Sequence, residues 1–318
     1  MKAVFLDYAS LDQNDLDFSE LHAVFENLTL YSASTEEQVL ERIQDVDVVI
    51  TNKVRISAEV IQQLPQLKLI LISATGTNNV DLVQAKKSGI VLCNCQAYGT
   101  SAVAQHTLML MLALSTSVIQ YHQAVQKGEW QKAQQFCLLD FPIVELAGKT
   151  LGIIGYGELG QAVAQLAKAF GMQIMVGALP NRPQREGRVQ LDVLLSQADY
   201  VSLHCPLTDE TKDLIDAKVF DRMKSSAFLI NCARGGIVNE QALADALIHN
   251  KIAGAATDVL TVEPPKQGNV LLNIDIPNLI ITPHSAWGSV DARQRIVQQL
   301  MENVKAFQNG QPIRQVNL

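Results

Sequence analysis

The stretch that decides the fold is TLGIIGYGELGQAVAQLAKAFGMQIMVG, residues 150–177. It opens with a short apolar run that is typical of a buried strand, and the turn Gly155-Tyr156-Gly157-Glu158-Leu159-Gly160 follows at once. Apolar residues then recur at helical spacing as far as Gly171, which predicts the end of a helix. A second β-branched run closes the stretch. The pattern therefore predicts a strand, a glycine-rich turn, a helix and a parallel strand.

Each glycine of the turn has a physical reason to be there. Gly155 permits a tight turn, Gly157 lets a pyrophosphate approach the backbone, and Gly160 lets the helix pack closely on the strand. The N–H groups at the start of the helix then face the phosphates. A glycine turn without a ligand is the alternative. We prefer a dinucleotide site, because the turn stands directly between a strand and a helix.

The residue that would choose between NAD and NADP departs from the usual pattern. An acidic residue is expected on the adenosine ribose, about 20 residues after the turn. Ala178 stands at the end of the second strand instead, and Arg182 and Arg185 lie just beyond it. Without a carboxylate to repel it, a ribose 2′-phosphate could be accepted with Arg182 as its partner. Both cofactors stay open, since these arginines could equally be solvated loop residues.

Outward from this unit, short apolar strands alternate with helices almost throughout, which predicts parallel sheets covered on both faces. Before the unit we expect strands at Ala3–Leu6, Leu28–Tyr31, Val46–Ile50, Leu69–Ile72 and Ile90–Leu92, and then one long connector helix near Ser101–Lys127. From the unit onward we expect strands at Thr150–Ile154, Gln173–Gly177, Tyr200–Leu203, Ala227–Asn231, Ala253–Asp258 and Leu279–Thr282, and a final helix at Ser289–Gln308.

Length and composition limit the possible classes. The 318 residues suggest about two domains, at ~150 residues each. Hydrophobic residues at 48% and charged residues at 18% exclude disorder as the main state. A formal charge of −7 argues against nucleic acid and anionic lipid as partners. The most apolar run, Leu108–Leu114, is too short for a membrane span. The N-terminus meets the carboxylate of Asp7 before a signal-peptide core could form, so we interpret it as a first strand.

The five cysteines predict a reduced, cytoplasmic protein. They are odd in number and scattered along the chain, which does not fit a disulfide framework. Cys93 and Cys95 stand close together, but no second Cys/His pair offers a zinc site at the usual spacing. We therefore expect no metal, and we interpret these two side chains as small buried apolar groups.

Three chemically capable residues follow successive strands of the second sheet. Arg234 lies in Asn231-Cys232-Ala233-Arg234-Gly235-Gly236, Glu263 follows the strand that ends at Asp258, and His284 lies in Thr282-Pro283-His284-Ser285-Ala286-Trp287. Doubly wound sheets place their sites at the carboxyl ends of strands. Each residue alone has a plain explanation as a surface or loop residue, but together they fit one reaction.

That reaction is hydride transfer to a 2-keto acid, which forms an alkoxide that needs a proton. His284 can supply it near neutral pH, and a carboxylate beside the ring, Glu263, favours the protonated form. The substrate carboxylate and keto oxygen need a planar cation, which Arg234 provides. We therefore predict His284 as general acid, Glu263 as its partner and Arg234 as substrate clamp.

With these motifs the chain resembles, over nearly its whole length, the D-isomer-specific 2-hydroxyacid dehydrogenases. Within that family it is similar to the glycerate dehydrogenase/hydroxypyruvate reductase type. Besides the stretches quoted above, the resemblance rests on Ala74-Thr75-Gly76-Thr77-Asn78-Asn79-Val80-Asp81, Tyr98-Gly99-Thr100-Ser101-Ala102-Val103-Ala104-Gln105-His106-Thr107 and His204-Cys205-Pro206-Leu207-Thr208. The run Tyr98-Gly99-Thr100 favours the glycerate branch.

The resemblance implies two doubly wound α/β domains, with a Rossmann nucleotide-binding domain inserted into a flavodoxin-like substrate domain. Residues 1–98 and 289–318 would form the substrate domain, and residues 99–288 the NAD(P)-binding domain, with the site in the cleft between them. The resemblance also implies a homodimer built around the connector helix.

It further implies which residues touch the ligands. Backbone N–H groups at Thr75 and Gly76 would hold the substrate carboxylate. Besides the glycine turn, cofactor contacts would come from Thr100, Glu158, Leu159, Cys205, Pro206, Cys232, Ala233, Arg234, Asp258, His284 and Ala286. We expect Trp287 to wall a small pocket and limit substrate size, with plain core packing as the alternative. His106 is interpreted as a packing or interface residue and His204 as a strand-end residue.

We therefore expect an NAD(P)-dependent reductase of small 2-keto acids. Hydroxypyruvate, which gives D-glycerate, is the favoured substrate and glyoxylate the second. Another D-2-hydroxy acid (lactate-like, phosphorylated or branched) is the main alternative, and formate or phosphite oxidation is more distant. A nucleotide-sensing binding protein on the same fold is the alternative outside enzymes. The arginine, glutamate and histidine speak against it, because a sensor has less need of a proton relay.

Overall fold

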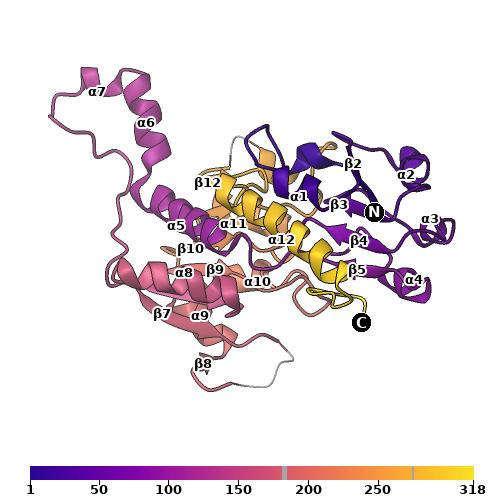
Figure 1. Cartoon of the computed structure of the whole chain (residues 1–318). Helices are drawn as coiled ribbons and strands as arrows, with labels where there is room; N and C mark the ends of the chain where they lie inside the picture. Colours follow the sequence, from indigo (N-terminus) through magenta and orange to yellow (C-terminus); the bar gives the residue numbers. More distant parts are fainter. Residues whose placement is uncertain (181–184, 274–275) are drawn as a thin grey trace. The chain divides into compact units, whose positions relative to one another are not determined.

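The computed structural model describes residues 1–180, 185–273 and 276–318, and these divide into two compact units (Figure 1). Unit 1 comprises Met1–Gly99 and Gly288–Leu318, and unit 2 comprises Thr100–Trp287. Unit 2 is therefore inserted, in sequence, between the two segments of unit 1.

Unit 1 is built on a five-stranded parallel sheet in the order β2-β1-β3-β4-β5. Its elements are β1 (Lys2–Phe5), the 3₁₀ helix η1 (Tyr8–Ser10), α1 (Ser19–Ala23), β2 (Asn27–Leu30), α2 (Glu36–Ile43), β3 (Val48–Thr51), α3 (Ala58–Ile61), β4 (Leu69–Ile72), α4 (Leu82–Lys87), β5 (Val91–Cys93) and α12 (Val290–Gln308). Every residue of β3 and β4 is buried, as expected of apolar strands covered on both faces.

The C-terminal helix α12 returns to the N-terminal part of unit 1 and packs against α1 (Figure 1). Arg293 is the polar anchor of this contact. Its guanidinium donates to both carboxylate oxygens of Asp15, at 2.7 and 2.6 Å, and to the carbonyl of Leu11 at 3.0 Å. The paired guanidinium lowers the pKa of the Asp15 carboxyl to about 2, so this contact persists into acid.

The strand order of unit 1 reverses at β1, and an internal carboxylate occupies that point. Asp7 follows β1 and is 5% exposed. Its oxygens accept the backbone N–H groups of Asn52 at 2.8 Å and Lys53 at 2.7 Å, just after β3. A doubly wound sheet can offer such N–H groups to an anionic ligand at this place. In unit 1 the chain's own carboxylate takes them.

Unit 2 is built on a seven-stranded parallel sheet in the order β12-β11-β10-β9-β6-β7-β8. Its elements are α5 (Thr100–Thr116), α6 (Val118–Gln126), α7 (Glu129–Lys132), β6 (Thr150–Ile154), α8 (Glu158–Ala169), β7 (Gln173–Gly177), β8 (Arg188–Val189), α9 (Leu191–Gln197), β9 (Tyr200–Leu203), α10 (Ala217–Phe220), β10 (Phe228–Asn231), α11 (Glu240–Ile248), β11 (Gly254–Thr257), the 3₁₀ helix η2 (Val270–Leu272) and β12 (Leu279–Ile281).

Both faces of this sheet are covered. Buried side chains of α5 and α8 pack on one face, together with Tyr200 and Phe228, whose rings stack at 5.1 Å. Side chains of α9, α10 and α11 form the core on the other face. The chain runs outward from β6 to β7 and β8, and then crosses to β9 on the opposite side of β6. The switch between β6 and β9 is where a doubly wound sheet opens a crevice for a ligand.

The expected single connector helix is in fact two helices, which corrects the sequence-based boundary. The chain breaks at Ser117, whose φ of 50° is left-handed, and α5 and α6 are bent by 60° at the break. The hydroxyl of Ser117 donates to the carbonyl of Pro142 at 2.7 Å, and this long-range contact supports the turn. Apolar periodicity continues across the break and gives no warning of it. Within the described ranges no single helix is long and apolar enough to cross a membrane.

The two-residue strand β8 was not predicted. It pairs with β7, and just beyond β7 the N–H of Ala178 donates to the carbonyl of Val189 at 2.8 Å. A strand this short carries no period-2 signal, so only the neighbouring edge of β7 defines it.

Candidate active site

The glycine-rich turn lies at the switch between β6 and β9. Gly155 has φ +97°, and a Cβ there would stand 2.5 Å from the backbone nitrogen of Cys205. A Cβ on Gly160 would stand 2.2 Å from the carbonyl oxygen of Gly155. By contrast, a Cβ on Gly157 would meet no atom within 4 Å. The turn is therefore tightly packed toward the sheet and open at Gly157, where a ligand can approach the backbone.

This open position continues into the N-terminus of α8. Gly157 is the N-cap and contributes no side-chain hydrogen bond, so the first N–H groups of the helix are available to an anion. The carboxylate of Glu158, the first residue of α8, accepts the hydroxyl hydrogen of Thr100 at 2.5 Å. This hydrogen bond connects the start of α8 to the start of α5. Leu159 is half-buried in the first turn and packs against the core on the α5 side. The cradle fits the pyrophosphate of a nicotinamide dinucleotide.

Across the switch, His204 directly follows β9 and has one ring nitrogen without a hydrogen-bond partner among the described residues. Its Nε2 and the Ser202 hydroxyl lie 2.8 Å apart, while its buried Nδ1 has no hydrogen-bond partner among the described residues. Burial lowers the pKa of His204 to about 4, so the ring is neutral near pH 7. The backbone of His204 packs against Gly155, and an unpaired buried nitrogen on this residue fits a site that a bound ligand completes.

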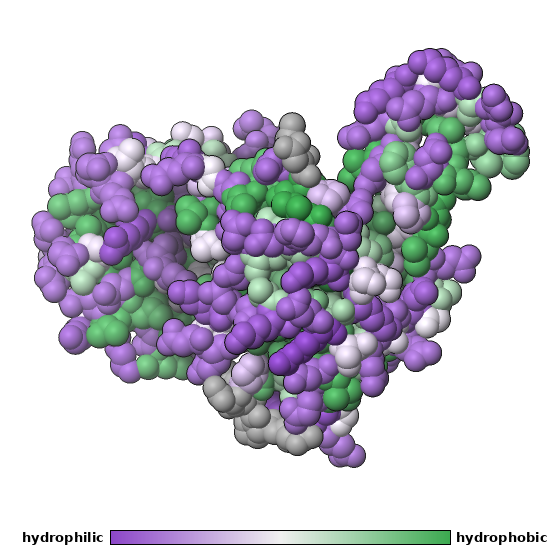
Figure 2. All heavy atoms as spheres, turned by 180° about the vertical axis from the view of Figure 1, so that it is seen from behind, coloured by the Kyte–Doolittle hydropathy of each residue, from purple (hydrophilic) through white to green (hydrophobic). Residues whose placement is uncertain are grey.

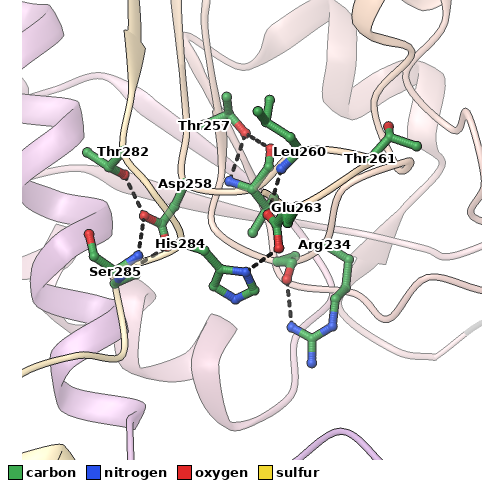
Figure 3. Close-up of polar contacts among 12 residues, drawn as sticks. Arg234, Thr257, Asp258, Leu260, Thr261, Glu263, Thr282, His284 and Ser285 are labelled. Atoms are coloured by element: carbon green, nitrogen blue, oxygen red, sulfur yellow. Dashed lines mark hydrogen bonds and ion pairs between the residues drawn. The ribbon is translucent and has the colours of Figure 1, made fainter. Parts of the chain in front are cut away.

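The three predicted catalytic residues come from neighbouring strands. Arg234 follows β10, Glu263 follows β11 and His284 follows β12, and these strands are adjacent in the order β12-β11-β10. Figure 3 shows the three side chains gathered beyond the strand ends. Parallel strands bring their carboxyl ends to one edge of a sheet, and this is why residues so distant in sequence meet.

The imidazole of His284 forms the central contact. Its Nδ1 lies 2.6 Å from Oε2 of Glu263, and Oε1 of the same carboxylate accepts the backbone N–H of Leu260 at 2.8 Å. An ionised carboxylate can only accept, so Nδ1 carries the proton of this hydrogen bond. The Nε2 edge points away from Glu263 (Figure 3). The pair is about one third exposed, at 35% and 33% for the two side chains, so a ligand can reach it.

The backbone of His284 is held in a conformation that favours glycine. Its φ is 52°, which is left-handed, and its N–H donates to the carbonyl of Asp258 at 2.8 Å. The next two N–H groups donate to the Asp258 carboxylate: that of Ser285 to Oδ1 and that of Ala286 to Oδ2, both at 2.9 Å. These hydrogen bonds compensate the backbone strain of the left-handed residue, which typically costs on the order of 1–3 kcal/mol. Asp258 thus positions His284.

The turn that carries Arg234 is braced by Asn231. The Asn231 amide donates to the carbonyl of Arg234 at 3.0 Å and accepts the N–H of Ala233 at 3.1 Å. Nη1 of Arg234 donates to the carbonyl of Ala233 at 2.7 Å, which fixes the direction of the exposed guanidinium. In Figure 3 this group lies beside the imidazole of His284.

The other predicted contact residues fall into separate places. Cys205, Cys232, Ala233 and Ala286 are buried in the segments that follow strands β9, β10 and β12 of unit 2, and Pro206 is exposed. Burial raises the pKa of the Cys205 thiol to about 11 and that of Cys232 to about 12, so neither is a thiolate near neutral pH. No cluster of three or more His, Cys, Asp or Glu in the described part of the chain could hold a metal.

Three predicted residues need separate mention. Thr75 belongs to unit 1, where its hydroxyl donates to the carbonyl of Cys95 and its own carbonyl accepts the Asn94 amide, so the loop with Gly76 is fixed. Trp287 packs against the core on the α5 side. Arg182 lies outside the described residues.

Sequence reasoning missed the polar chain behind His284. Thr282 donates its hydroxyl hydrogen to Oδ1 of Asp258 at 2.5 Å, and Nε2 of His106 lies 3.0 Å from the same hydroxyl. A hydroxyl has one hydrogen, so Nε2 of His106 must be the donor in the second contact. His106 was expected only to pack or to line an interface. No local sequence signal could reveal its role, because α5 brings it to β12 only through tertiary packing.

Comparisons with known proteins show which family and which relatives this chain resembles. A family model described as "D-isomer specific 2-hydroxyacid dehydrogenase, NAD binding domain" matches residues 108–286. A glycerate dehydrogenase from Methylorubrum extorquens is 46% identical over 311 residues, 98% of this chain and 97% of that protein. A hydroxypyruvate reductase from Blautia hydrogenotrophica is 38% identical over 323 residues, 100% of each chain. The structure of an acyclic imino acid reductase in complex with NADPH and D-Arg superposes with a TM-score of 0.85 at 29% identity, over 99% of this chain and 100% of that one.

The buried ring of His204 predicts a pH dependence of stability. Its pKa is about 4 in the folded chain against 6.5 as the ordinary value. Its contribution to stability is therefore complete above pH 6.5 and is lost as the pH falls toward 4, by about 2–3 kcal/mol. Urea unfolding at pH 7.5 and pH 4.5 measures this loss. A His204→Gln variant keeps an amide near Ser202 and should lose less stability between the two pH values. Equal losses in both proteins would contradict the prediction.

Proposed function

The chain belongs to the D-isomer specific 2-hydroxyacid dehydrogenase family, and on this premise we propose that it reduces hydroxypyruvate to D-glycerate and, more slowly, glyoxylate to glycolate. Both substrates are small 2-keto acids, and the same site would run the reverse oxidation. The observation that carries the proposal is the contact between Nδ1 of His284 and Glu263 at 2.6 Å, with Nε2 directed away from the carboxylate.

The proton chemistry follows from that contact. Nδ1 is engaged with Glu263, so Nε2 is the ring nitrogen that can exchange a proton with substrate. When the ring is doubly protonated, Nε2 donates to the keto oxygen as it becomes an alcohol, and the negative charge of Glu263 stabilises the cation before transfer. The bound nicotinamide supplies the hydride to the substrate C2. In the oxidative direction Nε2 accepts the hydroxyl proton.

Arg234 is proposed to orient the substrate. A guanidinium is always charged, and its planar fork matches a carboxylate or a carboxylate and keto oxygen together. The contact with the Ala233 carbonyl fixes the direction of that fork. We also assign the backbone N–H groups of Thr75 and Gly76 to the substrate carboxylate, and Trp287 to the limit on substrate size.

For the cofactor we propose that both NADH and NADPH are accepted. The glycine turn, the N-terminus of α8 and the strand ends after β9, β10 and β11 would hold the dinucleotide. Ala178 brings no carboxylate to the end of β7, so no charge at that position repels a ribose 2′-phosphate. The solved imino acid reductase that this chain resembles was crystallised with NADPH, and this supports the same proposal.

We propose a homodimer that forms through the segment 118–143. In Figure 1, α6 and α7 extend away from the sheet of unit 2, and Figure 2 shows apolar surface along this arm. Its exposed apolar side chains include Phe136 at 89% and Leu139 at 75% exposure. A patch of this kind marks an interaction surface rather than a solvated loop, and a second copy of the chain is its proposed partner.

The cellular compartment that we propose is the cytoplasm. The cysteines are free thiols, which supports a reducing compartment.

Initial rates of NADH and NADPH oxidation test the substrate and cofactor proposals together. We expect the highest kcat/KM with hydroxypyruvate, a lower value with glyoxylate and the lowest with pyruvate and branched 2-keto acids, and measurable rates with both cofactors. Consumption of neither cofactor with any of these acids would favour a nucleotide-sensing protein instead. If kcat/KM is highest with a branched or phosphorylated 2-keto acid, that acid replaces hydroxypyruvate as the assigned substrate within the same family.

Replacement of the proposed general acid separates chemistry from binding. We expect His284→Asn to lower kcat for hydroxypyruvate by about 10²- to 10⁴-fold, because the proton donor is lost. Fluorescence titration should show a Kd for NADH close to that of the unmodified chain, since the glycine turn is unaltered. His22→Asn, on an exposed position of α1 in unit 1, is the matched control. Retention of full activity in His284→Asn would defeat the assignment.

Substitution on the arm tests the homodimer. The unmodified chain should show twice its own mass by light scattering. Phe136→Ser combined with Leu139→Ser removes exposed apolar area and should shift the mass toward one chain. Val83→Ser alters an exposed apolar residue of α4 in unit 1, at 65% exposure, and should leave the mass unchanged. A single-chain mass for the unmodified protein would refute the dimer.

A further inference from the structure

The loop that carries Glu263 is held in place by an acidic residue outside the proposed site. We propose that Glu240, the first residue of α11, is a positioning residue for the pair of Glu263 and His284, and that only a carboxylate can do this at position 240. The inference rests on the proposed function, because it concerns the proton donor of that reaction. Nothing in the sequence singled out this residue.

Both carboxylate oxygens of Glu240 are in use. Oε1 accepts the backbone N–H of Thr261 at 2.7 Å, and Oε2 accepts the side-chain amide of Asn269 at 2.8 Å. The amide of Asn269 cannot turn over to suit a different partner, because its oxygen accepts the N–H of Leu271 at 2.9 Å and caps η2. Position 240 therefore faces two hydrogen-bond donors whose orientation is fixed.

The contact with Thr261 reaches Glu263 through one peptide unit. The N–H of Thr261 is bound by Glu240, and the preceding N–H, of Leu260, is bound by Oε1 of Glu263 at 2.8 Å. These consecutive donors belong to the same short loop, which Figure 3 shows above the imidazole. A shift of Thr261 moves the donor that orients Glu263, and with it the oxygen that holds Nδ1 of His284.

A second contact with the same loop comes from Gly235, the residue after Arg234, which packs against Leu260. A Cβ on Gly235 would stand 1.9 Å from the carbonyl oxygen of Leu260, so only glycine allows this approach. Gly235 directly follows Arg234, and the same segment leads into α11 at Glu240. One short piece of chain thus carries the substrate clamp, touches Leu260 and binds Thr261. It therefore sets the loop of Glu263 relative to Arg234.

The donor pattern shows why the charge matters. A glutamine at position 240 has one acceptor and one donor group, so it can accept from Thr261 only by presenting its NH₂ to the NH₂ of Asn269. One of the two contacts must then be lost. Adding Asn269→Asp reverses the polarity of the second contact, because the new carboxylate accepts the introduced NH₂ and still accepts the N–H of Leu271. The double variant is thus designed to restore both hydrogen bonds.

The test compares Glu240→Gln, the double variant Glu240→Gln/Asn269→Asp, and Glu36→Gln as the matched control at the exposed first position of α2 in unit 1. For Glu240→Gln we expect kcat for 2-keto acid reduction to fall about 10- to 100-fold through misplacement of the proton donor. The Kd for NADH should not change. The double variant should recover most of the loss, and the control should show none.

A readout independent of turnover is the NMR resonance of the proton on Nδ1 of His284, assigned with His284→Asn. This proton lies in the hydrogen bond to Oε2 of Glu263, whose heavy atoms are 2.6 Å apart. Loosening Glu263 lengthens that hydrogen bond, so in Glu240→Gln the resonance should move upfield or broaden through exchange with water. In the double variant it should return to its position in the unmodified chain.

Two results would overturn the proposal: a Glu240→Gln variant with the kcat and the Nδ1 proton resonance of the control, or a folded double variant with the defects of the single one. If the single variant does not fold, the double variant has to fold with both values restored, or the proposal fails. Absence of 2-keto acid reduction by the unmodified chain would overturn the proposed function instead. The NMR resonance of the His284 ring proton would still decide the role of Glu240.

Discussion

The backbone N–H groups of Ser285 and Ala286 donate to the carboxylate of Asp258, and the position of the His284 imidazole depends on these two hydrogen bonds. A carboxylate that is 1% exposed is costly to bury unless its lone pairs are used. Here they are used by two backbone donors and the Thr282 hydroxyl. The same bonds compensate the left-handed turn at His284. Because Asp258 directly follows β11 and His284 follows β12, the arrangement requires these two strands to be neighbours.

The two units treat their strand switch points in opposite ways. In unit 1 the N–H groups beyond β3 are satisfied by the carboxylate of Asp7, so this switch point is occupied from within the chain. In unit 2 the corresponding place carries Gly155 and Gly157 and the N-terminus of α8, with open space above Gly157. An internal carboxylate and an external phosphate are chemically equivalent partners for such N–H groups. The same sheet architecture thus gives one switch point that a side chain of the protein fills and one that fits a dinucleotide.

Local patterns in the chain predicted most of the strands, because parallel strands covered on both faces are short apolar runs such as Val48–Thr51 and Tyr200–Leu203. They failed at Ser117, where apolar periodicity continues although the helix breaks, and at β8, which is too short to carry a pattern. Arg234, Glu263 and His284 were recognisable because each follows a predicted strand. His106 and Glu240 were not, since neither lies at a strand end and their partners are far away in sequence.

The amino-acid sequence by itself determined the βα alternation, the glycine turn and the set of side chains able to transfer a proton and bind a carboxylate. These properties depend on neighbouring residues and on residue type, and both can be read along the chain. Tertiary structure alone decided that Nδ1 of His284 binds Glu263, that Nε2 of His106 donates to Thr282, and that Glu240 holds Thr261. Each of these is a hydrogen bond whose donor and acceptor come from different elements. Its existence depends on sheet order and helix packing, which no local pattern specifies.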